Sequence, residues 1–283
     1  MITKEQADKL HALAWTIRFR VIEMIGIGKT GHIGGSFSAA EIVSVLYGHQ
    51  MQHDPQVPDC PTRDRFVMSK GHAALAQYAA LAEFGYFPLD ELGHLKELGA
   101  MLQGHPDLRR TPGVEANTGS LGQGLSIAQG MALGIRLDKR KNRVYCLVGD
   151  GEIAEGQIWE AAMSASHYKL DNLTVFVDYN RIQATDHVIK RLNTNPMNSK
   201  WEAFGWHVIE VDGHDCSQIC QALEEAENQK GKPTAILAHT VKGKGVGFAE
   251  DTAAFHNGMM DQEQYQLALD LLAEKKGAFQ CKI

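Results

Sequence analysis

The residues from 144 to 182 restrict the fold of this chain more than any other stretch. An apolar run at 144–148 ends in a Gly-Asp-Gly turn at 149–151, and a second apolar run follows at 173–177. Between the two runs, apolar residues recur at helical spacing over 157–168. Because such apolar runs are typical of strands that are buried on both faces of a parallel sheet, the stretch predicts a strand–helix–strand unit.

Two polar side chains follow the predicted strands at the points where the strands end. Asp150 lies in the first turn, and Asn180 lies about one strand–helix–strand unit further along the chain. A right-handed crossover would place both side chains at the same edge of the sheet. Carboxylate and carboxamide oxygens suit a hard divalent cation, whose shell a diphosphate can complete. Either residue alone is ordinary in a turn, but the pair favours a cation site.

The rest of the chain continues the alternation of strands and helices. With 283 residues, of which 44% are hydrophobic, it can bury a large core. Capping patterns at Thr3 and at Ser38 predict the starts of the first two helices. Further strands are predicted at 66–68, 206–211 and 234–238, further helices at 73–84, from the glycine turn at 119–124 to about 138, at 217–228 and from 261, and a loop at 181–200. We therefore expect one doubly wound α/β domain over residues 1–283, with a mostly parallel sheet flanked by helices.

Composition excludes several classes of protein. The net charge of −6 and the pI near 6.1 provide no basic surface for nucleic acid. No apolar run is long enough to span a bilayer, and the polar N-terminus lacks the apolar core of a signal peptide. The five cysteines are odd in number and show no CxxC spacing. We expect reduced thiols and a cytoplasmic protein with neither nucleic acid nor a membrane as partner.

Three motifs make the chain resemble a known family. SKGHA at 69–73, TGSLGQG at 118–124 and GDGEIAEG at 149–156 look like signature motifs of transketolases and stand in the same order. The resemblance extends from about residue 10 to residue 260, and it covers only the amino-terminal half of a usual transketolase. It implies a thiamine diphosphate-binding domain of the diphosphate-side type. The pyrimidine-binding and C-terminal domains of the usual enzyme would then be absent from this chain.

The resemblance also implies a set of ligands at the strand ends. In transketolases, Mg²⁺ (or Ca²⁺ or Mn²⁺) is held at positions that match the side chains of Asp150 and Asn180 and the carbonyl of Ile182. Thiamine diphosphate contacts the backbone in the glycine turns. The positions that match its contacts are Gly119, Leu121, Gly149, Asp150, Gly151, Asn180, Ile182, His72 and His256.

Four histidines stand near glycine residues in predicted loops: His32, His72, His105 and His256. A zinc site is one interpretation, but the four lie far apart in the sequence and lack metal-ligand spacing. By resemblance, His72 and His256 match positions near the diphosphate and thiazolium, whereas His32, His105 and His256 match positions that face sugar hydroxyls. All four are therefore candidate catalytic residues, since imidazoles donate, accept and transfer protons near neutral pH.

The activity implied by the resemblance is ketol transfer. A two-carbon unit passes from a ketose, such as a sugar phosphate of pentose phosphate metabolism, to an aldose. In this family the glutamate that binds the aminopyrimidine and the basic residues that bind the sugar phosphate come from the absent half. We therefore expect activity only with a second, separately encoded pyrimidine-binding subunit, in a heterotetramer with two copies of each chain. Apolar residues around 156–159 are expected at that interface.

Two acidic residues after the Gly-Asp-Gly turn carry a further expectation. Glu155 and Glu160 match transketolase carboxylates that lie at the contact with the partner domain, where they are candidates for coupling two active sites. The alternative for both is a solvated acidic start of a helix.

Two other functions remain open. The α subunit of a 2-oxo-acid dehydrogenase shares the metal motif, although the motifs at 69–73 and 118–124 favour a transketolase. A non-catalytic thiamine diphosphate-binding module is the second alternative.

Overall fold

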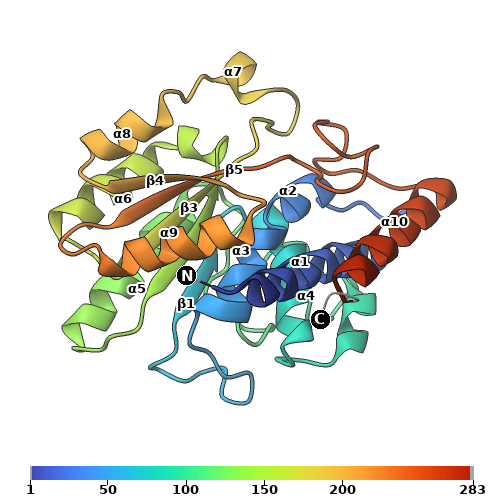
Figure 1. Ribbon diagram of the computed structural model, residues 1–283, viewed down its shortest axis with the longest axis horizontal. Helices are drawn as coiled ribbons and strands as arrows, with labels where there is room; N and C mark the ends of the chain where they lie inside the picture. The colour runs from blue at the N-terminus through green and yellow to red at the C-terminus, as the bar shows by residue number, and fades with distance from the viewer. Residues whose placement is uncertain (1, 281–283) are drawn as a thin grey trace.

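In the computed structural model, which describes residues 2–280, five parallel strands form one sheet with the order β1-β2-β3-β5-β4 (Figure 1). The strands are β1 (Arg65–Met68), β2 (Val144–Gly149), β3 (Leu173–Tyr179), β4 (His207–Asp212) and β5 (Thr234–His239). All five strands were predicted from the sequence to within two residues at each end. The doubly wound α/β fold is confirmed.

The register of the central strands sets the position of the polar turns. Gly149, the last residue of β2, pairs with Asp178 of β3. Because the strands are parallel, the residues that follow them leave from the same edge of the sheet. Asp150 and Asn180 therefore lie at neighbouring strand ends, as predicted.

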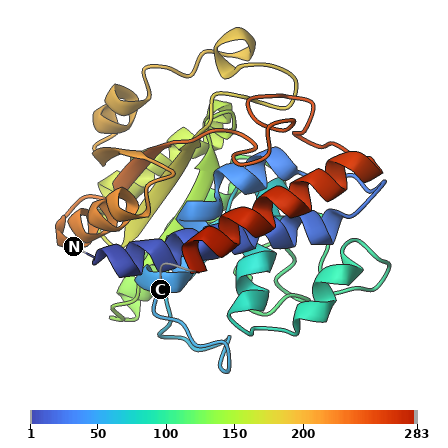
Figure 2. The same ribbon diagram turned by 45° about the vertical axis from the view of Figure 1, so that its right-hand side comes forward.

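Helices cover both faces of the sheet (Figure 1). Within β2, Tyr145 and Leu147 belong to the core on one face, whereas Cys146 and Val148 belong to the core on the other. The core on the first face includes α1 (Lys4–Ile25), α3 (Ala40–Val45), α4 (Ala74–Glu83), α9 (Cys216–Asn228) and α10 (Gln262–Gln280), of which α10 packs on α1, and the core on the second face includes α5 (Gln123–Leu137), α6 (Gly156–His167) and α8 (Met197–Ala203). Figure 2 shows α10 packed along α1, so the first and last helices of the fold lie side by side.

Short helical turns complete the fold. They are α2 (Ile33–Ser38), a π-helical turn (Leu46–Gln50), α7 (Val188–Arg191) and three 3₁₀ turns (Gly71–Ala73, Leu89–His94 and Glu152–Ala154). The predicted loop at 181–200 therefore contains α7 and the start of α8. Within the described residues, no helix is both long and apolar enough to cross a bilayer.

One predicted helix start is confirmed and the other is wrong. The Thr3 hydroxyl accepts a hydrogen bond from the Gln6 amide (3.2 Å), and the Gln6 side chain accepts one from the Thr3 amide (2.8 Å). Ser38, by contrast, does not cap a helix, because the chain is already helical from Ile33. Its hydroxyl donates to Asp178 (2.7 Å), so its contribution is to the sheet edge.

The apolar residues near 156–159, which were expected at the interface with a second chain, pack within this chain. Ile158 is fully buried in the core of this chain. Trp159 packs on Trp201 and Phe204, with ring centroids 5.2 and 5.1 Å apart, and its indole nitrogen donates to the Ile153 carbonyl (2.8 Å). These side chains stabilise the contact between α6 and α8, so Ile158 is not available to a second chain and Trp159 is only partly accessible.

Candidate functional site

A cavity of about 330 Å³ lies where the carboxyl ends of the strands meet. Its walls come from the segments that follow β1, β2, β3 and β5, including Lys70, Gly151, Asn180 and Lys242. Parallel strands place ligand sites at this edge because the turns that leave the sheet there diverge and leave a crevice.

Asp150 and Asn180 are held in place by neighbouring backbone groups. The Asp150 carboxylate accepts hydrogen bonds from the amides of Gly151 (2.8 Å) and Arg181, and the Asn180 carboxamide oxygen accepts one from the Ile182 amide (3.1 Å). Asp150 is only 2% exposed, and burial together with the Asp178 carboxylate raises its pKa to about 7. Among residues 2–280 no cationic side chain forms an ion pair with it. A divalent cation at this position would supply the missing positive charge, so the residues fit the expected group.

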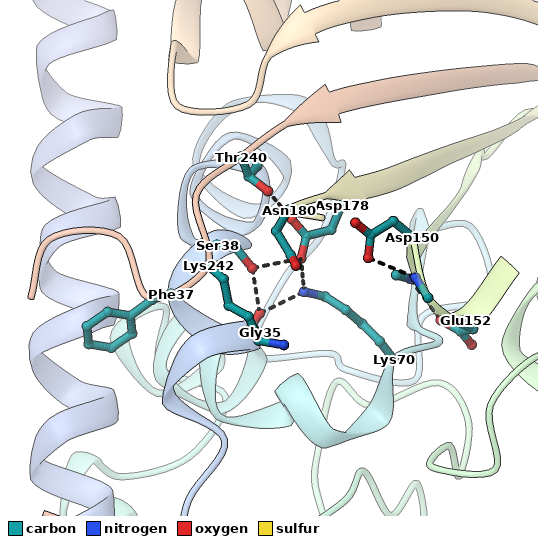
Figure 3. A network of polar contacts seen from close by, with 12 residues as sticks. Gly35, Phe37, Ser38, Lys70, Asp150, Glu152, Asp178, Asn180, Thr240 and Lys242 are labelled. Carbon is teal, nitrogen blue, oxygen red and sulfur yellow. Dashed lines mark hydrogen bonds and ion pairs between the residues drawn. The ribbon is translucent and has the colours of Figure 1, made fainter. Parts of the chain in front are cut away.

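A buried ion pair supports Asn180 from below (Figure 3). The Lys70 ammonium binds the Asp178 carboxylate and the Gly35 carbonyl (2.7 Å). The same carboxylate accepts hydrogen bonds from the Ser38 hydroxyl and from the side-chain NH₂ group of Asn180 (2.8 Å). Burial alone would raise the pKa of Asp178, but Lys70 and the hydrogen bonds outweigh burial and lower it. Because Asp178 takes the NH₂ group of Asn180, the carboxamide oxygen is left on the opposite side.

The loop after β5 brings a second lysine into the cavity. Lys242 is 2% exposed, and its ammonium donates to the carbonyls of Ile182 (2.7 Å) and Gln183 (3.2 Å) and lies 3.0 Å from Nδ1 of His256. Burial, reinforced by Lys70, lowers the pKa of Lys242 to about 8. The Ile182 carbonyl therefore already has one donor, and a cation there would share this oxygen with Lys242 or displace its ammonium.

A chain of buried polar groups fixes the backbone beside Lys242. His214 accepts a hydrogen bond at Nε2 from the Val241 amide (2.8 Å), which leaves the proton on Nδ1, 2.9 Å from the Glu41 carboxylate. Glu41 in turn accepts two hydrogen bonds from Arg18, both of 2.6 Å. Burial would raise the pKa of Glu41, but Arg18 and His214 together lower it to about 2.

The four candidate histidines converge on one side of the cavity. The ring centroid of His32 lies 5.1 Å from His72, 6.2 Å from His105 and 5.4 Å from His256, and His72 lies 4.9 Å from His256. Burial is the first cause of a lowered pKa in all four, with nearby cations adding to it: to about 4 for His32, to about 3 for His256, and below the ordinary value for His72 and His105. The imidazoles are therefore neutral near pH 7.

The histidine cluster does not support the zinc interpretation. Within the described residues, no group of three or more His, Cys, Asp or Glu side chains is arranged to hold a metal ion. The ring centroids lie 4.9–6.2 Å apart, which is the range of direct ring contacts, so the imidazoles pack against one another.

Backbone pairing brings the histidine loops together. Gly31 and Gly258 exchange two hydrogen bonds (3.0 and 3.1 Å), which places His32 next to His256 although the two residues are far apart in sequence. His105 lies against Gly119, which has a φ of 138°, and a Cβ there would come within 2.6 Å of the imidazole. Only glycine suits this position, because both the backbone conformation and the contact exclude a side chain.

The remaining predicted residues differ in their relation to the cavity. Leu121, Gly149, Gly151 and Glu155 line it, whereas Gly119 lies behind His105. His32 and His105 do not line it: His32 lies next to His72 and His256, which do, and His105 lies next to His32. Glu155 and Glu160 are both exposed, and their expected coupling role stays a prediction.

Sequence reasoning missed four residues at the site: Lys70, Glu152, Asp178 and Lys242. Lys70 lies inside the SKGHA motif, Glu152 directly follows the Gly-Asp-Gly turn, and Asp178 precedes Asn180 by two positions. Each had a positional signal, since each follows or ends a predicted strand. No signal in the sequence indicated that Lys70 pairs with Asp178, because that pairing depends on the order of the strands in the sheet.

Comparison with known protein families shows to which family this chain belongs. Residues 10–279 match the family model of the transketolase thiamine diphosphate-binding domain. The chain belongs to this family. The transketolase domain is 46% identical over 277 residues to a 6-deoxy-6-sulfo-D-fructose transketolase subunit of Clostridium sp., a match that covers 98% of this chain and 100% of the relative. It is 39% identical over 270 residues to one of the subunits of the apulose-4-phosphate transketolase of Phocaeicola vulgatus, with coverage of 95% and 96%.

A solved structure confirms the fold of the transketolase domain. Transketolase from Campylobacter jejuni superposes with a TM-score of 0.84 at 31% identity, over 100% of this chain and 49% of that one. The same domain thus occurs in relatives named as subunits and as about half of a longer transketolase. None of these relatives is a 2-oxo-acid dehydrogenase.

Proposed function

We propose that this chain is the thiamine diphosphate-binding subunit of a two-chain transketolase, which transfers a two-carbon ketol unit from a ketose to an aldose. The observation that carries the proposal is one arrangement at the sheet edge. Asp150 and Asn180 lie side by side at the cavity, and four neutral histidines cluster beside it, two of them in its wall. The full-length match to relatives named as transketolase subunits supports it.

In this proposal the strand ends hold the cofactor through a divalent cation. Asp150, Asn180 and the Ile182 carbonyl supply three oxygen ligands for Mg²⁺ (or Ca²⁺ or Mn²⁺), and the diphosphate completes the shell. The Gly151 amide, which in the ligand-free chain donates to the Asp150 carboxylate, and the lysines in the cavity wall are the donors available to its remaining oxygens. Thiamine diphosphate supplies the carbanion chemistry that breaks and forms the carbon–carbon bond.

The histidines perform the proton transfers and orient the sugar. His256 accepts a hydrogen bond at Nδ1 from Lys242, so its Nε2 carries the proton and can donate to a substrate oxygen. In this proposal His32 and His105, which do not line the cavity, meet the sugar hydroxyls, while His72, in the cavity wall, lies nearer to the diphosphate. Their low pKa values keep all four neutral, so each can accept as well as donate.

We infer that the partner is a pyrimidine-binding subunit that is separately encoded, and that the enzyme contains two copies of each chain. Exposed apolar residues border the cavity and are suited to this contact: Leu121 (37% exposed) and Leu192 (58%) line it, and Ile189 (65%) lies on the neighbouring α7. Glu155, exposed at the cavity wall, and Glu160 would then meet the partner and couple the two sites.

The substrates in this proposal are sugars that carry a terminal anion, as the names of the two subunit relatives indicate for those proteins. We place the enzyme in the cytoplasm because Cys60, Cys146, Cys216 and Cys220 are free thiols; Cys281 lies outside the described residues.

The test is reconstitution. The purified chain is mixed with the pyrimidine-binding subunit encoded in the same genome, the complex is weighed by light scattering, and ketol transfer is assayed with Mg²⁺ and thiamine diphosphate. We expect a complex of two plus two chains, activity in the mixture and none in either chain alone. Transketolase activity of this chain alone would refute the proposal. Cofactor binding without activity in the complex would favour the non-catalytic module.

A further inference from the structure

Glu152 is a buried carboxylate that connects three separate turns of the site. It begins the 3₁₀ turn after the Gly-Asp-Gly sequence and is 3% exposed. Its Oε1 accepts hydrogen bonds from the Ser69 hydroxyl (2.5 Å) and the Gly122 amide (2.9 Å), and its Oε2 accepts one from the Gly149 amide (3.0 Å). Figure 3 shows this side chain below Asp150.

The three turns that Glu152 joins are the three motif segments of the sequence. Ser69 follows β1, Gly122 precedes α5, and Gly149 ends β2. Each of these segments contributes a residue to the cavity wall: Lys70, Leu121 and Asp150. No other side chain among residues 2–280 forms hydrogen bonds to all three segments.

The backbones of the turns around Glu152 are so closely packed that a side chain larger than that of glycine does not fit at Gly71 or Gly124. A Cβ on Gly124 would lie 2.4 Å from the Ser69 hydroxyl, and one on Gly71 would lie 2.6 Å from the Gly119 amide nitrogen. The first and second turns are therefore in direct contact through glycine. Glu152 attaches both of them to the third turn.

The need to fill space does not explain why the residue at position 152 carries a carboxylate. Burying a charge is unfavourable unless hydrogen bonds compensate for it. An apolar residue would avoid that cost but would leave two amides and one hydroxyl without their acceptor. The three donors therefore account for the carboxylate.

We propose that Glu152 is a positioning residue, which sets the separation of the Gly122 and Gly149 turns at the width that the diphosphate of the cofactor requires. This inference rests on the proposed function, because it takes thiamine diphosphate as the ligand. Glu152 itself does not touch the reacting atoms. It acts through the backbone of the two turns and through Ser69.

The experiment compares Glu152→Gln with Glu115→Gln in the complex with the partner subunit. Glu115 is a matched control, because its side chain is 6% exposed and binds Arg63 and Arg65 near the amino end of β1, away from the strand ends that form the cavity. For each variant, the dissociation constant of thiamine diphosphate is measured by calorimetry with Mg²⁺, together with Tm, the KM of the ketose and kcat at saturating cofactor.

We expect Glu152→Gln to weaken cofactor binding by about 10- to 100-fold, with the KM of the ketose and kcat nearly unchanged once cofactor is saturating. Glu115→Gln should lower Tm without changing cofactor affinity. If Glu152→Gln does not fold, Glu152→Asp keeps the charge but shortens the reach, and it should show the same split with a smaller change.

Two outcomes would overturn the inference and are distinct from each other. Equal cofactor affinity in the wild type and the folded Glu152 variants would refute the positioning role and leave the proposed function intact. Failure of the wild-type complex to bind thiamine diphosphate would refute the proposed function and the inference with it.

Discussion

Replacing Asp178 with Asn should destabilise the protein strongly, although the two side chains have the same shape. One Asp178 oxygen accepts from Lys70, Ser38 and Asn180, and the other accepts from Thr240. The single oxygen of Asn can keep the first three donors, so the main loss is charge. Lys70 is 1% exposed and would be left without a counter-charge. Breaking a buried ion pair in this way costs about 3–5 kcal/mol.

The assay is chemical and thermal unfolding of the ligand-free chain. For a chain of this length, about 3–5 kcal/mol corresponds to a decrease in Tm of roughly 6–10 °C. A double-mutant cycle with Lys70→Met separates charge from packing, since the double variant has neither a buried cation nor a buried anion. We expect the double variant to be more stable than Asp178→Asn alone. A loss below about 1 kcal/mol in Asp178→Asn, or a double variant that is less stable than either single one, would refute the reasoning.

Further predictions concern the cation, the histidines and the glycine contacts. Asp150→Ala should abolish Mg²⁺-dependent binding of thiamine diphosphate while the circular dichroism spectrum stays native; unchanged affinity in calorimetry would rule out the metal assignment. His32→Ala and His105→Ala should lower kcat of the assembled enzyme more than they weaken cofactor binding, and wild-type kinetics in both would remove them from the substrate site. Gly124→Ala should cost about 1–3 kcal/mol in urea unfolding, because its Cβ would lie 2.4–2.6 Å from the residue that follows β1. Gly130→Ala in the same helix is the control, since no atom lies within 4 Å of its Cβ; it should be neutral or stabilising. Stability should also fall as the pH drops from about 6.5 to about 4, because the low pKa of His32 means that unfolding takes up a proton there; His32→Ala should lose part of that decline in unfolding titrations.

The parts of the site that could be predicted from sequence are those that depend on residues close together along the chain. The apolar runs before Asp150 and Asn180 identified two strands, and the helix between them required the strands to be parallel. That was enough to place the two side chains together, and the register of β2 and β3 confirms it. The capping box at Thr3 was equally local and was also confirmed.

The parts that could not be predicted depend on long-range packing. Ser38 and Glu41 fit a capping pattern, but each side chain has a stronger partner from a distant segment: Asp178 for Ser38, and Arg18 for Glu41. The apolar appearance of Trp159 similarly did not show that α8 would cover it. In each case, the sequence pattern was compatible with the observed structure but did not specify which partner the side chain would contact.

The backbone bridge between Gly31 and Gly258 has a consequence for how the protein is made. It joins a segment near the start of the chain to one near its end, and His32 and His256 meet only when it has formed. During synthesis the sheet strands up to β5 can pair before residues 255–258 have left the ribosome. The cation ligands can therefore be assembled while the histidine cluster is still incomplete. Contacts of such high sequence separation also form late and slowly in refolding, so binding competence should appear before catalytic competence.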